Sequence, residues 1–403
     1  MSQIRPFRAV RAAEALAARV IAPPYDVMSE DEARAIVAAN PSSFVRVSRP
    51  ESVMPAGTDA HAPEAYETAK RQLAAMEAEG LLVQDERPSY YLYGQKMGEH
   101  FQVCLVAGFS VDEYDRGLVK KHEFTRPDKE KDRVEHIDAT NTQTGMVFLA
   151  YRDTERLDSL IRKGTEGTPL WTVTTEDAVV HTLWRLDDAA TIAAITEAVS
   201  ALPCTYVADG HHRSAAASIV HRRRAGKPGD HAWFVAGLFP ASSLRILAYN
   251  RAVRDLNGHT AAQLLAAIGE RFDVSPAVQP VPAAPGEFTM YLDGTWHRLV
   301  ARDIPGDPVA ALDVSILQDR VLQPLLAIAD PRTDRRIDFV GGIRGWRELV
   351  KLVDGGSHAV AFHLHPTSMA QLLAVADAGQ VMPPKSTWFE PKLRDAVAMH
   401  RLD

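Results

Sequence analysis

The chain has 403 residues, enough for two or three domains with their own hydrophobic cores. Hydrophobic residues make up 46% and charged residues 24%, which is typical of a globular protein and excludes a disordered or fibrous chain. The formal net charge of −7 provides no overall attraction to nucleic acids or anionic lipids. We therefore expect neither a nucleic acid nor a membrane as a partner.

Cysteine content and hydropathy indicate the compartment. Two cysteines, Cys104 and Cys204, are too few for a disulfide framework or a four-cysteine zinc site. Charged residues interrupt every apolar run of residues 1–23, so the core of a signal peptide is missing. No stretch reaches the roughly 18 apolar residues that span a bilayer. We therefore expect a cytoplasmic protein.

The first 80 residues are predicted to be largely helical. Prolines 23 and 24 keep residues 22–27 out of a helix. Ser29 and Glu32 can form a capping box, which predicts a helix through Ala39. The other elements expected here are an extended stretch at 6–10, a short helix at 12–19, a loop at 54–63 and an amphipathic helix at 64–79.

From residue 89 the hydrophobic pattern changes to the two-residue period of β-strands. A hairpin is expected to turn near Gly98, between strands at 90–94 and 101–110. Further strands are predicted at 145–151, 179–185 and 205–208, with helices at 189–201 and after Gly210. Hairpins that precede any strand–helix unit favour an α+β fold over a doubly wound sheet.

Four prolines within residues 275–286 predict a linker or a long loop. Beyond it, Asp293-Gly294 is a good hairpin turn. Helices are expected at 313–328, with a kink at Pro324, at 346–353 and at 368–376. We therefore divide the chain into two regions, 1–255 and 256–403.

The first candidate site lies where a predicted strand ends at Gly210 and a helix begins. Free backbone N–H groups and the positive end of the helix dipole would face an anion there. Arg213 and one of the adjacent His211 and His212 can add charged donors, which suits phosphate. The alternative is that Asp209 only caps the helix and Arg213 is a solvated surface residue.

The second candidate site precedes a helix that starts at Pro127, which Thr125 is expected to cap. Glu123 lies ahead of this helix, beside His122 and two lysines that include Lys121. Nearby positive charge can hold such a carboxylate ionised, as a general base requires. The charged run that follows is adequately explained as a solvated, salt-bridged helix.

Other polar runs are less specific. Asn141 opens a polar run before a strand, which is either a ligand-contacting loop or an ordinary turn. His363 and His365 share one strand face and form either a metal site or, as is commoner, half-buried strand residues. The sequence 385–387 ends like a phosphate-binding P-loop but lacks its glycines.

Five segments resemble a large bacterial family long described as of unknown function, some members of which have been assigned as pyrophosphate-dependent serine kinases. They are residues 22–27, 121–123, 208–213, 249–251 and 382–389. The segments around Glu123 and Asp209 also resemble the two signature segments of free L-serine kinases with the ParB/sulfiredoxin-like fold. The resemblance implies a ParB/sulfiredoxin-like catalytic core with large insertions and an N-terminal extension in 1–255. The C-terminal α+β region would contribute to the site.

The implied reaction transfers a phosphoryl group from pyrophosphate to the hydroxyl of free L-serine, giving O-phospho-L-serine and phosphate, with Mg²⁺ as cofactor. Glu123 matches the glutamate that takes the hydroxyl proton, and Asp209 matches the aspartate near the donor phosphate and the metal. The expected phosphate-binding residues are Gly210, His211, His212, Arg213, Lys121 and Lys385. The expected substrate-binding residues are His122, Thr125, Asn141, Ser386 and Thr387.

Two other functions stay open at this point. A serine kinase that uses ATP or ADP would need an apolar slot for the adenine. A non-catalytic, ParB-like regulator that binds nucleotide or DNA would use the same phosphate site without turnover. Sulfur reduction is disfavoured, because His211 occupies the position of the sulfiredoxin cysteine.

Overall fold

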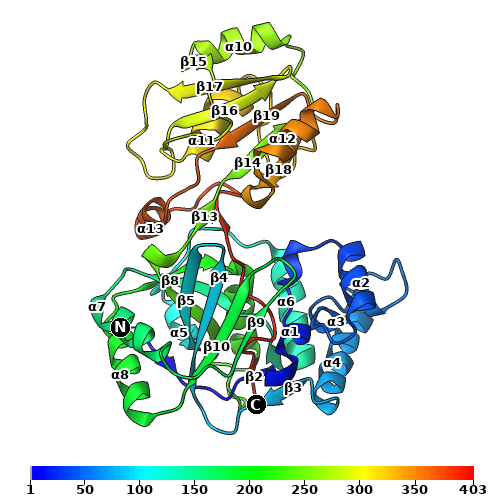
Figure 1. The fold of residues 1–403 in the computed structure, drawn as a ribbon, viewed down its shortest axis with the longest axis vertical. Coiled ribbons are helices and arrows are strands. Elements are labelled where there is room, and N and C mark those ends of the chain that lie inside the picture. The colour runs from blue at the N-terminus through cyan, green and yellow to red at the C-terminus, as the bar shows by residue number, and fades with distance from the viewer. Residues whose placement is uncertain (1) are drawn as a thin grey trace. The chain divides into compact units, whose positions relative to one another are not determined.

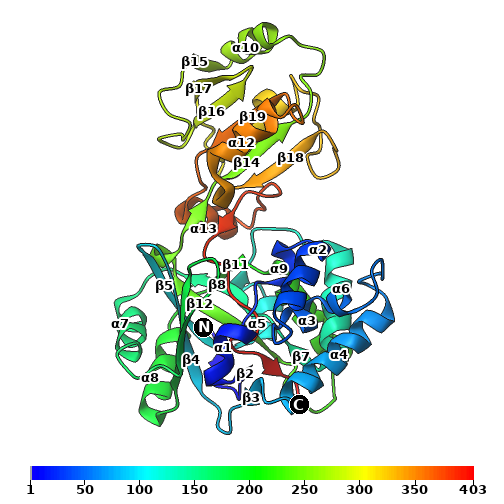
Figure 2. The same cartoon turned by 45° about the vertical axis from the view of Figure 1, so that its right-hand side comes forward.

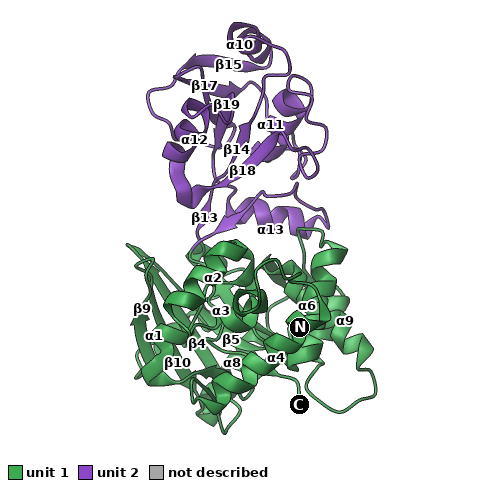
Figure 3. Ribbon diagram, turned by 90° about the vertical axis from the view of Figure 1, so that its right-hand side faces the viewer, with its two compact units in different colours: residues 1–244, 391–403 green, residues 245–390 purple. Residues whose placement is uncertain are grey.

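The computed structural model describes residues 2–403 (Figure 1). It forms two compact units (Figure 3). Unit 1 comprises the chain up to Leu244 together with Pro391–Asp403, and unit 2 is Arg245–Glu390. None of the helices in residues 2–403 combines the length and the apolar composition that a membrane span requires.

This division differs from the boundary placed at residue 255. Strand β14 (Tyr249–Val253) pairs with two strands of unit 2, so it belongs to that unit. The end of the chain returns to unit 1, where β21 (His400–Arg401) pairs with β7 (Thr142–Gln143). Both differences arise from pairing between distant segments, which local sequence patterns do not report.

The N-terminal part of unit 1 is helical, as predicted. The capping box of Ser29 and Glu32 is present and opens α2 (Glu30–Ala39). One 3₁₀ turn at Tyr25–Val27 lies within the segment expected to be non-helical, directly after Pro24. The other helices and short strands here are α1 (Ala17–Val20), α3 (Val45–Ser48), α4 (Pro63–Ala78), β2 (Val10–Ala12) and β3 (Leu82–Gln84).

A mixed β-sheet is the centre of unit 1, with strand order β6-β11-β8-β12-β5-β4-β10-β9 and β1 paired to β5. The predicted hairpin is confirmed as β4 and β5. Strand β6 runs parallel to β11, and β8 runs parallel to β12. The strands are β1 (Ile4–Arg5), β4 (Tyr90–Met97), β5 (His100–Ser110), β6 (Val119–Lys120), β8 (Val147–Tyr151), β9 (Trp171–Thr174), β10 (Val180–Leu186), β11 (Thr205–Asp209) and β12 (Trp233–Pro240).

Helices cover this sheet. In Figures 1 and 2, α7 and α8 lie on one side of it, and α2, α3, α4 and α6 lie on the other. Apolar residues of α6 and α9, among them Val134, Ile137 and Val220, form a buried cluster. The helices of this part are α5 (Val111–Asp115), α6 (Pro127–Thr140), α7 (Glu155–Gly164), α8 (Ala189–Ser200) and α9 (His211–Arg223).

Unit 2 is built on an antiparallel sheet with strand order β15-β17-β16-β19-β14-β18. The predicted hairpin at Asp293-Gly294 is confirmed. The helix expected at 313–328 is much shorter, because α11 ends at Leu317 and one π-helical turn follows it before Pro324. The other elements are β15 (Phe272–Pro276), β16 (Glu287–Leu292), β17 (Thr295–Ala301), β18 (Ile337–Gly341), β19 (Val360–Leu364), α10 (Ala261–Gly269), α11 (Asp313–Leu317), α12 (Gly345–Asp354) and α13 (Met369–Asp377).

The mixture of helices and largely antiparallel sheets confirms the α+β class. The ParB/sulfiredoxin-like identity of the core stays a prediction.

Candidate functional site

Two neighbouring parallel strands bring the predicted site segments together. Strands β6 and β11 pair in parallel, with Val119 opposite Thr205. The segments that follow the two strands therefore leave the sheet at the same end. Residues 121–123 follow β6, and α9 follows β11. Between β11 and α9, Gly210 has a φ of 86°, a left-handed conformation that glycine adopts without strain.

Glu123, His122 and His211 form a close cluster at this edge. Oε2 of Glu123 lies 3.9 Å from Nδ1 of His211. The two imidazole rings are perpendicular, with centroids 4.5 Å apart. Both histidines are buried, whereas 43% of the Glu123 side chain is exposed. The cluster therefore joins a buried histidine pair to a carboxylate that solvent can reach.

The three histidines of the site are neutral near pH 7. Burial lowers the pKa of His122 to about 4, and burial together with the neighbouring His122 lowers the pKa of His211 well below its ordinary value. Burial also lowers the pKa of His212, whose Nε2 accepts a hydrogen bond from the backbone N–H of Arg126 at 3.2 Å. These side chains therefore offer neutral donors and acceptors, not positive charge, to a bound anion.

Asp209 is ionised, and each of its oxygens accepts a hydrogen bond. Its Oδ1 accepts a hydrogen bond from the backbone N–H of Gly210 at 2.7 Å, and its Oδ2 accepts one from Nζ of Lys392 at 2.6 Å. Burial acts to raise the pKa of this carboxyl, but the charge and hydrogen bond of Lys392 outweigh burial and hold it well below its usual range. The expectation that Asp209 only caps α9 is excluded, because the N-cap is Gly210.

Each oxygen of Asp209 accepts one hydrogen bond and keeps a second lone pair, so this carboxylate fits as a Mg²⁺ ligand, and its binding of Mg²⁺ stays a prediction.

Arg213 points into the interior of unit 1. Its Nη1 donates to the carbonyl of Met146 at 3.0 Å, and its Nη2 lies 3.7 Å from Oδ1 of Asp395. Only 16% of the side chain is exposed, so the alternative of a solvated surface arginine is excluded. Gly145 makes this arrangement possible, because a Cβ at that position would lie 2.5 Å from Oδ1 of Asp395.

Tyr25 lies between two arginines. Its ring centroid is 3.8 Å from Cζ of Arg133 and 5.4 Å from Cζ of Arg213. Burial raises the pKa of Tyr25 to about 12, so the hydroxyl keeps its proton. Arg133, Arg213, Tyr25 and Asp395 line a cavity of about 30 Å³, which is enough for about two water molecules.

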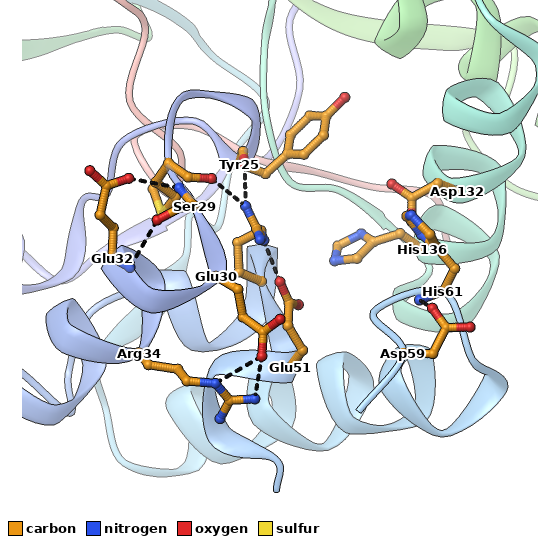
Figure 4. Close-up of polar contacts among 12 residues, drawn as sticks. Tyr25, Ser29, Glu30, Glu32, Arg34, Glu51, Asp59, His61, Asp132 and His136 are labelled. Carbon is orange, nitrogen blue, oxygen red and sulfur yellow. Dashed lines mark hydrogen bonds and ion pairs between the residues drawn. The ribbon is translucent and has the colours of Figure 1, made fainter. Parts of the chain in front are cut away.

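Arg49 holds the backbone of the Tyr25 segment in place. It donates to the carbonyl of Tyr25 at 3.0 Å and to that of Met28 at 2.7 Å, and it forms an ion pair with the buried Glu51. Figure 4 shows Tyr25 and Glu51 in this region, together with the capping box of Ser29 and Glu32. The segment 22–27 is thus tied to the wall of the site.

Comparison with family models gives one match, which covers residues 4–315 and is described as a protein of unknown function (DUF1015). The chain belongs to this family. The resemblance to a family formerly without assigned function is therefore confirmed. No curated protein matches the chain.

Several solved structures are similar at low identity. A mutant free serine kinase in complex with AMP is 12% identical, with coverage of 74% of this chain and 92% of that chain and a TM-score of 0.39. SbnI with a C-terminal truncation, from Staphylococcus aureus, is 12% identical, with coverage of 71% of this chain and 82% of that chain and a TM-score of 0.39. A conserved hypothetical protein from Pyrococcus furiosus is 14% identical, with coverage of 72% of this chain and 93% of that chain and a TM-score of 0.35. Because these TM-scores are low, the proposal below rests on the site and the family resemblance.

Two predicted substrate-binding residues of unit 1 have other partners. Thr125 donates to the carboxylate of Glu130, and the N-cap of α6 is Arg126 without a side-chain cap, so the predicted Thr125 cap is wrong. Asn141 ends α6 at its other end, where it bonds Asp403 at 2.5 Å. Their predicted substrate contacts stay predictions.

The two candidate lysines lie against aromatic rings. Nζ of Lys121 is 3.9 Å from the ring centroid of Tyr114, and burial lowers the pKa of this amine. Nζ of Lys385 is 5.6 Å from the ring centroid of Tyr249 in unit 2. Phosphate binding by either lysine stays a prediction.

The remaining predicted residues of the 385–387 segment also belong to unit 2. The hydroxyl of Ser386 donates to the carbonyl of Pro383 at 2.6 Å, and its carbonyl accepts from Thr367 at 2.9 Å. Thr387 follows in the same segment. Substrate binding by Ser386 and Thr387 stays a prediction.

The alternative metal site at His363 and His365 is not supported. Nδ1 of His363 bonds the carbonyl of Pro280, and Nδ1 of His365 bonds that of Pro366, each at 3.0 Å. Within residues 2–403, the one cluster of three such side chains close enough to share a metal is His122, Glu123 and His211.

Sequence reasoning missed the side chains that complete the site from distant segments. They are Tyr25, Arg133, Lys392 and Asp395. Tyr25 lies in a segment that carried the family resemblance, which was its only signal. Lys392 and Asp395 are far along the chain from the residues that they contact, and no local pattern indicates those contacts.

Proposed function

We propose that the chain is a phosphotransferase that acts on a small alcohol, with free L-serine as the acceptor and pyrophosphate as the donor. One observation carries the reaction class: the Glu123 carboxylate lies 3.9 Å from His211, in the first turn of α9. A candidate base is thus beside a candidate phosphate site. The identities of acceptor and donor follow the family resemblance.

Phosphoryl transfer depends on alignment and charge stabilisation more than on covalent help from the protein. In our proposal the donor phosphate lies at the N-terminus of α9, where backbone N–H groups and the helix dipole favour an anion. The acceptor hydroxyl lies against Glu123. That carboxylate takes the hydroxyl proton as the new O–P bond forms, and the bridging P–O bond breaks to release phosphate.

His211 is suited to orient the base. Its Nε2 accepts from the backbone N–H of His122 at 3.5 Å, so in this neutral tautomer the proton is on Nδ1, which faces Glu123. The separation of 3.9 Å exceeds a hydrogen bond, and such contacts tighten when substrates bind. We assign no step to Mg²⁺, which we propose as the counter-ion of the donor.

The choice of donor rests on the family resemblance. Pyrophosphate has no base or ribose to accommodate, whereas ATP or ADP would need an apolar slot for the adenine. The cavity of about 30 Å³ beside Arg213 holds about two water molecules and is too small for any of these donors, so it does not distinguish between them.

The test is a donor screen on the full-length chain. The protein is incubated with L-serine, Mg²⁺ and one of pyrophosphate, ADP or ATP, and phosphoserine and phosphate are measured by ³¹P NMR. We expect phosphoserine and phosphate in equal amounts with pyrophosphate, and no phosphoserine with ADP or ATP. Turnover with ATP or ADP instead would identify the nucleotide-dependent kinase. Binding of nucleotide or DNA without turnover for any donor would favour the ParB-like regulator.

A further inference from the structure

We propose that His122, Glu123 and His211 form a binding site for a divalent transition-metal ion of the kind that imidazole prefers, such as Zn²⁺ or Co²⁺. One ligand atom from each residue lies within 4.8 Å of those of the other two. This site is separate from the Mg²⁺ of the proposed reaction, and its existence does not depend on that reaction.

His122 is the first reason. It is 2% exposed, and neither of its ring nitrogens has a hydrogen-bond partner of normal geometry. Buried polar atoms in folded proteins are nearly always paired, so such a ring calls for a bound water or ion.

His211 and Glu123 supply the other ligands. Nδ1 of His211 faces Oε2 of Glu123 at 3.9 Å, a gap that an ion about 2.1 Å from each atom would fill. Ion binding requires the other tautomer of His211, with the proton on Nε2. That change gives up the 3.5 Å hydrogen bond from the His122 backbone N–H and places two donors opposite each other, so the His211 ring must turn slightly when the ion binds.

The donor set decides the class of metal. Two neutral imidazoles and one carboxylate are ligands for Zn²⁺ and related ions, whereas Mg²⁺ prefers oxygen ligands alone. Ligands around one such ion lie roughly 3 to 3.5 Å apart. The three ligand atoms must therefore move closer together when the ion binds, and the partly exposed Glu123 can rotate toward the two imidazole rings.

The surroundings of the cluster also suit a cation. The Asp209 carboxylate acts on both His122 and His211 with the sign that favours positive charge, although Lys121 opposes it at His211. Since 43% of the Glu123 side chain is exposed, an ion can reach the cluster from solvent. An ion bound there occupies Glu123, so under the proposed function it would also inhibit turnover.

The test is a titration of the chelator-treated, full-length chain with Co²⁺ alone, followed by visible absorption, and with Zn²⁺ alone, followed by calorimetry. We expect one ion per chain, visible Co²⁺ bands typical of four or five ligands, and displacement of Co²⁺ by Zn²⁺ but not by millimolar Mg²⁺. Glu123→Gln should weaken Co²⁺ binding at least 10-fold. His122→Ala should abolish the bands.

A control variant changes the other close histidine pair, His221 and His231, whose Nδ1 atoms lie 2.9 Å apart. His221→Asn should bind Co²⁺ as the unmodified chain does. The proposal is overturned if the unmodified chain binds no Co²⁺, or if Glu123→Gln binds it unchanged. Glu123 is half-exposed, so Glu123→Gln is expected to fold. The Co²⁺ titration of this variant therefore tests the site even if His122→Ala fails to fold. No substrate is present, so the outcome is independent of kinase activity.

Discussion

Nζ of Lys392 lies 2.6 Å from Oδ2 of Asp209 and joins the C-terminal segment to the end of β11. The β4–β5 hairpin holds that segment in place, because Gln95 donates to the carbonyl of Lys392 at 2.8 Å and Gln102 donates to that of Pro391 at 3.2 Å. The last residues of the chain are therefore part of the candidate site, although unit 2 separates them in sequence from the rest of unit 1.

The first prediction concerns this ion pair. In Lys392→Met, burial of Asp209 is no longer opposed by the lysine, so the pKa of Asp209 should rise. A raised pKa means that the carboxylate is protonated at higher pH, so the acid limb of the pH–activity profile should move to higher pH. Activity at pH 7 should fall about 10-fold, which corresponds to about 1.4 kcal/mol in the activation barrier. Lys163→Met, an exposed change on α7, is the control, and an unchanged profile in Lys392→Met would contradict the role of the pair.

The second prediction concerns the space beside Gly145. A Cβ in Gly145→Ala would lie 2.5 Å from Oδ1 of Asp395 and 3.0 Å from Cζ of Arg213, so both charged groups have to move. We expect a loss of roughly 1 to 3 kcal/mol in the free energy of unfolding and lower activity. Gly269→Ala is the matched control, because no atom lies within 4 Å of its added Cβ. Equal unfolding curves for the two variants would show that the cavity wall is not rigid.

The third prediction tests the support of the Tyr25 segment. Arg49→Ala leaves the carboxylate of Glu51, whose side chain is 1% exposed, without its partner. Breaking a buried pair costs about 3 to 5 kcal/mol in the free energy of unfolding, whereas removing both charges costs less. The double variant Arg49→Met, Glu51→Gln should therefore be more stable than Arg49→Ala. Urea unfolding measures the difference. Arg162→Ala removes an exposed pair with Glu155 and should cost less than about 1 kcal/mol.

The fourth prediction concerns pH and unit 2. Burial raises the pKa of Asp313 to about 7, against the lowering effect of hydrogen bonds from the backbone of Gly286 and His365, and its Oδ2 has no hydrogen-bond partner. Between pH 4 and 7 the folded chain thus keeps a proton that the unfolded chain has lost. The contribution of this proton to the free energy of unfolding is complete below the pKa of Asp313 in the unfolded chain. It is lost as the pH rises through the pKa of Asp313 in the folded chain.

Asp313→Asn removes this titration and keeps an oxygen for the Gly286 N–H. Relative to the unmodified chain, the variant should gain stability as pH rises from 4 to 8. The gain is on the order of 4 kcal/mol at most, at about 1.4 kcal/mol for each pKa unit. Calorimetric unfolding across this range measures it. A stability difference that does not change with pH would contradict the assigned ionisation.

Local signals were enough to predict much of the fold. The capping box of Ser29 and Glu32, the β4–β5 hairpin and the start of α9 at Gly210 depend on neighbours in sequence, and all three are confirmed. The helix expected at 313–328 was overextended, because its apolar period continues past the point where the backbone changes to a π-helical turn.

The candidate site was only partly predictable. Glu123 and the 209–213 segment each carry a local motif, but their proximity comes from the parallel pairing of β6 with β11. Lys392 reaches Asp209 across 183 positions, and a lysine in a polar segment is an ordinary surface residue by its sequence alone. Residues placed by long-range packing therefore appear only in the structure.

The central claim is that Glu123 readies an alcohol for a phosphate held at the N-terminus of α9. Its most direct measurement is phosphoserine formation from L-serine and pyrophosphate by Glu123→Gln, with pyrophosphate binding measured in parallel by calorimetry. We predict turnover reduced at least 1000-fold with pyrophosphate affinity retained within about 3-fold. Turnover by Glu123→Gln at a rate close to that of the unmodified chain would contradict the account.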